Sequence, residues 1–256
     1  MTDKISHKPE TAPHPSGRQL EICAFSPEAA KIAAANGAHR VELCENASDG
    51  GTTPSFGTIR KVRESISIEL YPIIRPRGLN FLYADEEFEI MILDIAICKE
   101  LGCDGISIGI QLQNGEIDLE RMKRAVEVAY PMGVTCNRVI DRVPNPEAAL
   151  EGLISIGVER VLTSGQGATA MEGIEKLTAW QKGYGNDIII MPGAGVRSNN
   201  LLALMSKTGC SEYHTSARLA VKDEVAYANP AIADSGKYWI ADREEIGKMA
   251  GILNPL

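Results

Sequence analysis

The sequence predicts a single (β/α)8 barrel, an α/β fold in which a closed parallel sheet lies inside a ring of helices. The chain has 256 residues, close to the roughly 250 over which such a barrel closes around one core. A glycine followed by a strand-like run recurs four times, and further strand-like runs lie between these repeats. Strands that alternate with helices form a parallel sheet with right-handed crossovers, and eight of them favour closure.

The four repeats carry every second strand of the predicted barrel. They are the segments 37–44, 102–109, 157–164 and 209–216. Each begins with a glycine, which is favoured just past a helix because it enters the left-handed region without a Cβ penalty. The four glycines lie 65, 55 and 52 residues apart, so each period holds two βα units and the chain holds eight strands.

The other strands are expected between the repeats, at 20–25, 68–74, 133–138 and 187–191. Residues typical of helix N-termini follow these strands, in agreement with the alternation of strands and helices. Ser26–Glu28 and Asn145–Glu147 each offer an N-cap residue, a proline at the first helical position and an acid in the first turn. Asp85–Glu87 opens a long third helix. No GxGxxG motif follows the first strand, which removes the main support for an open dinucleotide-binding sheet.

The two ends of the chain depart from this regular order. Residues 1–17 lack the apolar stretch of a secretory signal, and we expect them to form a disordered tail. Residues 18–256 are expected to form the barrel. Its last part, after Leu219, has only one weak helical stretch, at 242–249. We therefore expect an irregular C-terminal segment with a displaced or shortened closing helix.

Composition and charge exclude several partners. Hydrophobic residues make up 44% of the chain and charged residues 23%, which is typical of a globular protein with a sizeable core. The net charge of −8 repels phosphate backbones and anionic membranes, so we expect neither nucleic acid nor a membrane as partner. The six cysteines include no CxxC motif, and a chain of this size needs no disulfide. We interpret them as reduced thiols of a cytoplasmic protein.

Strand parity predicts which side chains face the centre of the barrel. Side chains alternate along a strand, so apolar residues that pack on the helices leave their neighbours pointing inward. Buried charges are costly unless they are paired or bind a ligand. Two interpretations follow: a pocket for an anionic small molecule, and a set of buried ion pairs with a purely structural role. The inward polar residues are Glu21, Cys23, Glu42, Cys44, Arg75, Asn137, Glu212, His214 and Ser216.

The turns after the last strands indicate where an anion would bind. Two glycines follow the seventh strand, and small residues with an arginine follow the eighth. Barrels commonly hold phosphate here, because glycines let backbone N–H groups approach the anion. Alternatively, the glycines only form tight turns. The predicted anion-binding residues are Arg77, Ser164, Gly165, Gly193, Gly195, Ser216 and Arg218.

Elimination leaves two kinds of chemistry. No lysine lies at a strand end, only one histidine faces inward, and there is no GxSxG motif, so Schiff-base, hydrolytic-metal and serine mechanisms are unsupported. One remaining function is that of a lyase or isomerase that acts on a phosphorylated or carboxylated metabolite. The other is the binding of Cu(I), which prefers few soft ligands, by Cys23 and Cys44. The catalytic candidates are Glu21, Glu42, Arg75, Asn137, Asp141 and His214.

Several motifs in the right order resemble the copper homeostasis protein CutC family, from about Leu20 to Arg218. The resemblance implies a cytoplasmic barrel, usually a homo-oligomer, in which residues matching Cys23 and Cys44 bind copper. The motifs are Leu20–Cys23, Arg40–Asn46, Gly50–Ser55, Ile74–Gly78, Phe81–Tyr83, Arg160–Gly165, Met191–Gly193 and His214–Arg218.

Two stretches depart from the family pattern. A Phe-His-Arg stretch in the fifth strand is here Cys136–Arg138, and a Gly-Gly-Gly stretch is here Gly193–Gly195, with alanine in the middle. Asparagine hydrogen-bonds but cannot act as a general base, so chemistry that relies on the histidine is lost or altered. Three functions stay open: a copper-binding protein, a barrel enzyme, and a noncatalytic barrel that acts through its oligomer surface.

Overall fold

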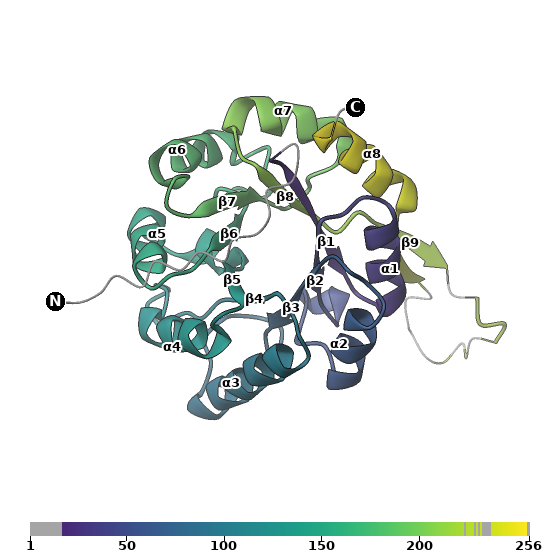
Figure 1. Cartoon of the computed structure of the whole chain (residues 1–256), viewed down its shortest axis with the longest axis horizontal. Coiled ribbons are helices and arrows are strands. Elements are labelled where there is room, and N and C mark those ends of the chain that lie inside the picture. Colours follow the sequence, from purple (N-terminus) through teal and green to yellow (C-terminus); the bar gives the residue numbers. More distant parts are fainter. Residues whose placement is uncertain (1–16, 223, 228, 230, 232–236, 255–256) are drawn as a thin grey trace.

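The closed arrangement of strands and helices predicted from the sequence is the observed fold. The structure, a computed structural model, describes residues 17–222, 224–227, 229, 231 and 237–254. Figure 1 looks along the barrel, with the strands in the centre and the helices around them. Within the described residues one sheet holds eight parallel strands in the hydrogen-bonded order β7-β6-β5-β4-β3-β2-β1-β8. β7 and β8 lie side by side, which brings the ends of the sheet together into a nearly closed barrel.

The strands lie where the repeats and the runs between them predict. The glycines that open the four repeats all have positive φ, between 69° and 91°. This confirms that each turns the chain out of a helix in the left-handed conformation. The strands are β1 (Gln19–Ala24), β2 (Arg40–Leu43), β3 (Glu69–Ile74), β4 (Gly105–Ile108), β5 (Gly133–Cys136), β6 (Arg160–Thr163), β7 (Ile189–Pro192) and β8 (Glu212–Thr215).

The helices follow the strands in alternation. Ser26 caps the first one as predicted, since its hydroxyl accepts a hydrogen bond from the N–H of Ala29 at 3.1 Å. Asn145 precedes the fifth helix but does not cap it, because its side chain donates to Glu116 instead. The helices are α1 (Pro27–Ala35), α2 (Phe56–Arg63), α3 (Asp85–Glu100), α4 (Leu119–Ala129), α5 (Pro146–Ser155), α6 (Ile174–Tyr184), α7 (Ser198–Thr208) and α8 (Arg243–Leu253).

An apolar layer fills the space between the sheet and the helices. Leu20 and Ile22 of β1, and Val41 and Leu43 of β2, have no exposed surface and belong to this core. Each such side chain contributes about 1.5–3 kcal/mol to the stability of the fold. The residues between them face the barrel axis, as parity predicts, and this alternation places polar side chains inside the barrel.

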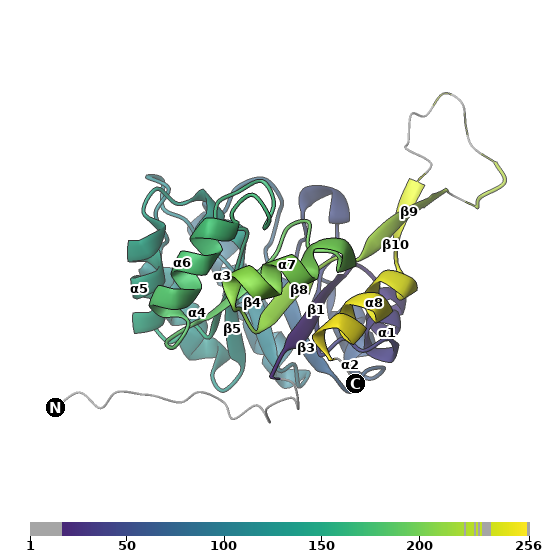
Figure 2. The ribbon, with the colours of Figure 1, turned by 90° about the horizontal axis from the view of Figure 1, so that it is seen from above.

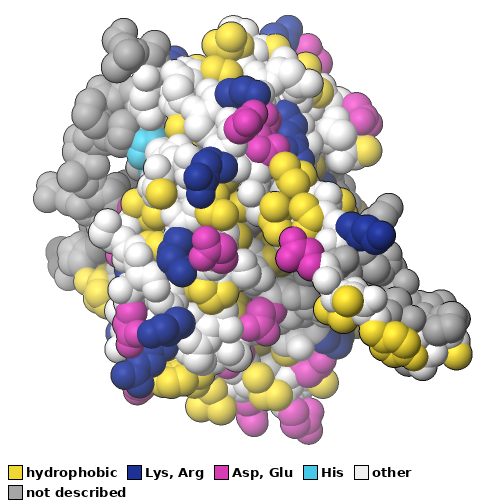
Figure 3. Space-filling view, turned by 90° about the vertical axis from the view of Figure 1, so that its right-hand side faces the viewer, with side chains coloured by type: hydrophobic (Ala, Val, Ile, Leu, Met, Phe, Trp, Pro, Cys, Tyr) yellow, Lys and Arg dark blue, Asp and Glu magenta, His cyan; other side chains and the backbone are white. Residues whose placement is uncertain are grey.

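A hairpin separates β8 from the closing helix. Its strands, β9 (Arg218–Lys222) and β10 (Lys237–Ala241), pair antiparallel and project from the barrel (Figure 2). Figure 3 shows apolar side chains on this arm, where Tyr227 is 76% exposed and Trp239 50%.

The closing helix itself is regular. α8 has 11 residues, as many as α4, α6 and α7, and it packs between α7 and α1 (Figure 1). The expected displacement or shortening of this helix is therefore wrong, because the irregular sequence belongs to the hairpin before it. Most of the predicted tail, residues 1–16, lies outside the described residues. Among the described helices, none combines the length and apolarity that a membrane span requires.

Candidate functional site

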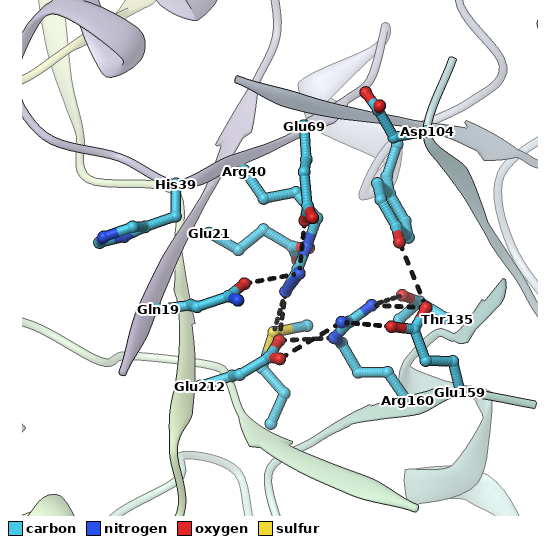
Figure 4. A network of polar contacts seen from close by, with 12 residues as sticks. Gln19, Glu21, His39, Arg40, Glu69, Asp104, Thr135, Glu159, Arg160 and Glu212 are labelled. Atoms are coloured by element: carbon cyan, nitrogen blue, oxygen red, sulfur yellow. Dashed lines mark hydrogen bonds and ion pairs between the residues drawn. The ribbon is translucent and has the colours of Figure 1, made fainter. Parts of the chain in front are cut away.

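A network of ion pairs fills the half of the barrel where the strands begin (Figure 4). Arg40 of β2 and Arg160 of β6 lie at its centre with at most 2% of their surface exposed. Arg40 Nε donates to Glu21 at 2.5 Å, and Arg40 Nη2 donates to Glu212. Arg160 Nε donates to Glu212 at 2.6 Å. Glu212 therefore bridges the two guanidinium groups.

Further groups complete this network. Glu69 pairs with Arg40 at 3.1 Å, and Glu159 pairs with Arg160 at 3.1 Å. Both guanidinium groups also lie over the ring of Tyr71, at 5.1 and 5.4 Å from its centroid. Burial alone would lower the pKa of both arginines, but the surrounding carboxylates raise both pKa values above the ordinary value. Both arginines stay charged, so the structural interpretation of the inward charges applies to this layer.

Arg40 and Arg160 stand in motifs of the family resemblance, but the sequence did not predict either as an inward-facing residue. The signal that identifies them is parity, because Arg40 stands two residues before Glu42 and Arg160 two residues before Leu162. Glu42 and Leu162 both line the inside of the barrel. Applying the parity rule to the first residue of each strand therefore identifies both arginines.

Above the network, the carboxyl ends of the strands surround a cavity of about 350 Å³. Barrel enzymes place their active sites at this end, and the volume is in the range of small-molecule sites. Glu21 and Cys44 lie next to the cavity but are not part of its wall. The predicted residues that do line it are Cys23, Glu42, Arg75, Asn137, Asp141 and His214.

His214 links the cavity to the ion network. Its Nδ1 lies 2.6 Å from Glu21 Oε1, and its Nε2 lies 3.8 Å from Glu42 Oε2. Burial alone would lower the pKa of His214, but Cys23, Glu21 and Glu42 raise it well above its ordinary value. Burial alone would raise the pKa of Glu21, but Arg40 and His214 lower it to about 2. Glu21 is thus a paired carboxylate and a poor candidate for a general base.

Two thiols meet at the ends of β1 and β2. Cys23 Sγ donates to Cys44 Sγ at 3.6 Å, and both sulfurs lie with a Glu42 oxygen in a cluster within 4.8 Å of one another. Cys23 is half-buried and lines the cavity, whereas Cys44 is buried. Burial and the neighbouring Cys23 raise the pKa of Cys44 well above its ordinary value. The structure therefore brings the two predicted metal ligands together.

Arg75 and Asn137 reach another part of the cavity wall. Arg75 Nη1 donates to the carbonyl oxygens of Asp49 and Gly51, at 2.7 Å each. Asn137 Oδ1 accepts from the N–H of Val139 at 3.0 Å. Both side chains are 4% exposed, and each keeps one nitrogen without a partner among the described residues, Nε of Arg75 and Nδ2 of Asn137.

The loop after β6, predicted to bind an external anion, already holds a carboxylate of the chain. Asp141, on a short 3-10 helix (Arg138–Arg142), accepts hydrogen bonds from the N–H groups of Ser164 and Gln166 at 3.0–3.1 Å. The N–H of Gly165 donates to a threonine hydroxyl at 2.9 Å. The prediction of an anion site at Ser164 and Gly165 is therefore corrected, and Asp141 anchors this loop.

At the start of α7, side chains of the chain itself also accept the backbone N–H groups. The N–H of Arg197 donates to the side chain of Asn200 at 2.9 Å, and the N–H of Ser198 donates to Glu245 at 2.7 Å. Glu245 lies on α8, so the closing helix supplies the negative charge that a helix N-terminus attracts. An anion site at this helix end is therefore corrected as well.

The glycines before α7 form a tight turn, as the alternative interpretation predicts. The N–H of Gly193 donates to the carbonyl of Thr163 at 2.8 Å, and Gly195 has a φ of 72°. Ala194 also has a positive φ, 74°, which is unfavourable for a residue with a Cβ atom. This conformation explains why the family pattern has glycine at the position of Ala194.

Three further predicted anion ligands lie away from the cavity. Arg77 pairs with Glu87 at 2.6 Å in the loop before α3. Arg218 lies over the ring of Trp239, 4.5 Å from its centroid, and lines with Ser216 a narrow crevice beside the hairpin. They therefore do not share the central cavity, because parity fixes the direction of a side chain within a strand but not the path of the loop after it.

Sequence and fold agree with one family. The sequence model of the CutC family matches residues 18–219. A protein named CutC from Parabacteroides distasonis is 46% identical over 213 residues, which cover 83% of this chain and 88% of that protein. A protein of the same name from Xylella fastidiosa is 41% identical over 236 residues, 92% of this chain and 88% of that protein.

The crystal structure of CutC from Streptococcus agalactiae, a protein named for copper homeostasis, has 30% identity and a TM-score of 0.74, and the match covers 78% of this chain and 98% of that one. The chain therefore belongs to the CutC family.

Proposed function

We propose that this protein binds Cu(I) as its cargo through Cys23 and Cys44 and takes part in copper homeostasis. The observation that carries the proposal is the separation of 3.6 Å between the two Sγ atoms. Metal–thiolate bonds of about 2.3 Å allow one ion to bind two sulfurs that lie up to about 4.6 Å apart. The two sulfurs therefore lie within the span that one metal ion can bridge.

The ligand set favours copper over zinc. Structural zinc sites take four ligands, usually thiolate and imidazole. The only cluster of potential metal ligands in the described part of the chain holds Cys23, Cys44 and Glu42. Two soft thiolates suit Cu(I), which binds few soft ligands, whereas a carboxylate oxygen contributes little to a soft ion.

The surroundings of Cys44 keep its thiol protonated until metal arrives. The raised pKa of Cys44 means that its thiol holds its proton near neutral pH. Metal binding displaces the thiol protons. Glu42 belongs to the same cluster and lines the cavity, so its carboxylate is placed to pass a proton from the thiols to the open end of the barrel.

The cellular setting in this proposal is the cytoplasm. All six cysteines are unpaired thiols, and free thiols persist where the surroundings are reducing. The name of the Streptococcus agalactiae relative, which refers to copper homeostasis, supports the same role for this chain.

Competition with a Cu(I) chelator tests the proposal. The parent protein should withhold one equivalent of Cu(I) from bicinchoninate, and the double variant Cys23→Ser, Cys44→Ser should bind more weakly by about 100-fold or more, a loss of about 3 kcal/mol. A double variant that binds as tightly as the parent would show that the site is wrong.

A second pair of thiols provides the matched control. Cys98 and Cys103 also interact with one another and are buried, but they do not line the cavity. The variant Cys98→Ser, Cys103→Ser removes the same number of sulfurs and should keep the Cu(I) affinity of the parent. Circular dichroism of both double variants confirms that each is folded.

A further inference from the structure

Two guanidinium groups meet at the mouth of the barrel without a carboxylate between them. Arg75 and Arg142 both donate to the carbonyl oxygen of Leu79, at 3.4 and 3.1 Å, and both lie over the ring of Phe81, at 4.9 and 5.2 Å. Within the described part of the chain, neither takes part in an ion pair. Like charges this close repel one another, and an anion between them relieves the repulsion.

The backbone that holds these arginines is strained. Leu79 has a φ of 78°, in the left-handed region that a leucine rarely adopts. This conformation turns its carbonyl oxygen toward both arginines, while its side chain is exposed and gains no packing. Strain of this kind persists where the surroundings enforce it, often at ligand sites.

One side of the Arg75 guanidinium group carries a donor that the described part of the chain does not use. Its two Nη1 hydrogens go to backbone carbonyls, whereas its Nε is buried and has no hydrogen-bond partner among the described residues. Burial raises the pKa of the neighbouring Tyr83 to about 12, while the charge and hydrogen bonding of Arg75 act to lower it. Nε and Nη2 together form a side-on fork, which matches the two oxygens of a carboxylate.

Asn137 adds a second donor group to the wall of the same cavity. Its Oδ1 is fixed by the N–H of Val139, so Nδ2 is the end of the amide that remains. That nitrogen is buried and has no partner among the described residues, and its side chain lines the same cavity as Arg75. A buried donor without a partner is unfavourable, and an acceptor on a ligand would satisfy it.

The wall formed by β2 and β8 has the opposite character. Glu42 and His214 line the cavity there, and Glu42 presents a carboxylate. A ligand that reaches from Arg75 to the Glu42 carboxylate needs a hydrogen-bond donor at its second end.

We infer that the mouth of the barrel binds a small organic carboxylate, with its carboxylate group against Arg75, Asn137 and Arg142 and with a hydroxyl or amino group toward Glu42. The cavity of about 350 Å³ limits the ligand to a small metabolite. The usual phosphate position of barrels, after the seventh and eighth strands, is not used, because Glu245 takes up the N–H of Ser198 and Asn200 takes up the N–H of Arg197 at the start of α7. This inference goes beyond the copper proposal and does not depend on it.

Isothermal titration calorimetry of the copper-free protein tests the inference. The probes are lactate, malate and alanine, which carry a donor group, then propionate and succinate, which lack it, and inorganic phosphate, all at one ionic strength set with sodium chloride. We expect saturable binding at one site for at least one probe with a donor group, about tenfold or more tighter than for its counterpart without one. Phosphate should give no saturable heat.

Two variants identify the site. Asn137→Asp keeps the oxygen that accepts from Val139 and replaces the amide nitrogen by a charged oxygen, so it should weaken binding about tenfold or more. Arg142→Gln should weaken it in the same direction. Arg124→Gln removes an exposed arginine of α4 outside the cavity and should bind like the parent. Asn137→Asp and Arg142→Gln should keep the Cu(I) affinity of the parent, which separates this result from that of the copper experiment.

Three outcomes would overturn the inference. They are saturable binding of phosphate without any carboxylate, no binding of any carboxylate by the folded parent, and equal binding by the parent and Asn137→Asp. Equal affinity for propionate and lactate would overturn the assignment of Glu42 to the second end of the ligand.

Discussion

Glu21 Oε1 lies 2.6 Å from Nδ1 of His214, and this contact joins the ion network at the bottom of the barrel to the cavity at its mouth. The other carboxylate oxygen of Glu21 accepts from Arg40 at 2.5 Å. His214 in turn lines the cavity together with Cys23 and Glu42. One buried carboxylate therefore supports both the fold and the wall of the candidate site.

Acid should destabilise the protein through Glu21. The pKa of Glu21 is about 2 in the fold, below the roughly 4.3 expected in the unfolded chain, so the folded state binds this proton more weakly. The stabilisation is fully present above about pH 4.3, is lost as the pH falls through about 2, and amounts to about 3 kcal/mol. Urea unfolding between these pH values measures it.

The variant Glu21→Gln should flatten this pH dependence, because the amide does not titrate. Glu28→Gln, which changes an exposed acid of α1, is the control and should retain the slope of the parent. Equal slopes for the parent and Glu21→Gln would mean that the acid response originates elsewhere.

Loss of Arg160 should destabilise the fold strongly. The variant Arg160→Met leaves Glu159 without its close partner and Glu212 with Arg40 alone, and removing one member of a buried pair costs about 3–5 kcal/mol. Arg124→Met, at an exposed position of α4, should stay within about 0.5 kcal/mol of the parent. Chemical denaturation compares the two, and similar midpoints would contradict a stabilising network.

Removal of Glu245 should open an anion site at the start of α7. Glu245 binds the N–H and the hydroxyl of Ser198 at 2.7 and 2.8 Å, and loss of such a capping charge costs about 1–2 kcal/mol. Phosphate should restore part of this stability in Glu245→Ala, because helix N-termini bind anions. Glu244→Ala, at the exposed neighbouring position, should show neither effect. A thermal melt of Glu245→Ala that does not respond to phosphate would contradict the assignment.

Ala194→Gly should stabilise the protein. Ala194 has a φ of 74°, a conformation that costs a residue with a Cβ atom about 1–2 kcal/mol, while glycine loses about 0.5–1 kcal/mol through the entropy of the unfolded chain. The net gain is up to about 1.5 kcal/mol. The same change at Ala203, exposed on α7, should instead cost about 1 kcal/mol. Shifts of the same sign in the two melting temperatures would refute the strain at Ala194.

The order of strands and helices could be predicted because local signals repeat along the chain. Glycine past each second helix and alternating apolar residues in each strand depend only on neighbours in sequence, and both are confirmed. The hairpin after Arg218 could not be predicted in this way, because its two strands are joined by a long segment, 223–236, and not by a two-residue turn.

The candidate site was predictable only in part for a similar reason. Parity places Cys23, Glu42 and His214 on the cavity wall, since alternation is a local property. The carboxylates that bind the loop after β6 and the start of α7 come from distant parts of the sequence. Asp141 reaches Ser164 across 23 positions of sequence, and Glu245 reaches Ser198 across 47. A turn that is suited to an anion can bind a carboxylate of its own chain, and only the fold shows which carboxylate arrives there.

X-ray absorption at the copper edge, on protein loaded with one equivalent of Cu(I), tests the central claim most directly. The proposed site at Cys23 and Cys44 predicts a first shell dominated by two sulfur atoms at about 2.3 Å. This shell should be lost in the variant Cys23→Ser, Cys44→Ser and kept in Cys98→Ser, Cys103→Ser. A first shell of nitrogen and oxygen alone, or a sulfur shell that persists in Cys23→Ser, Cys44→Ser, would contradict the claim.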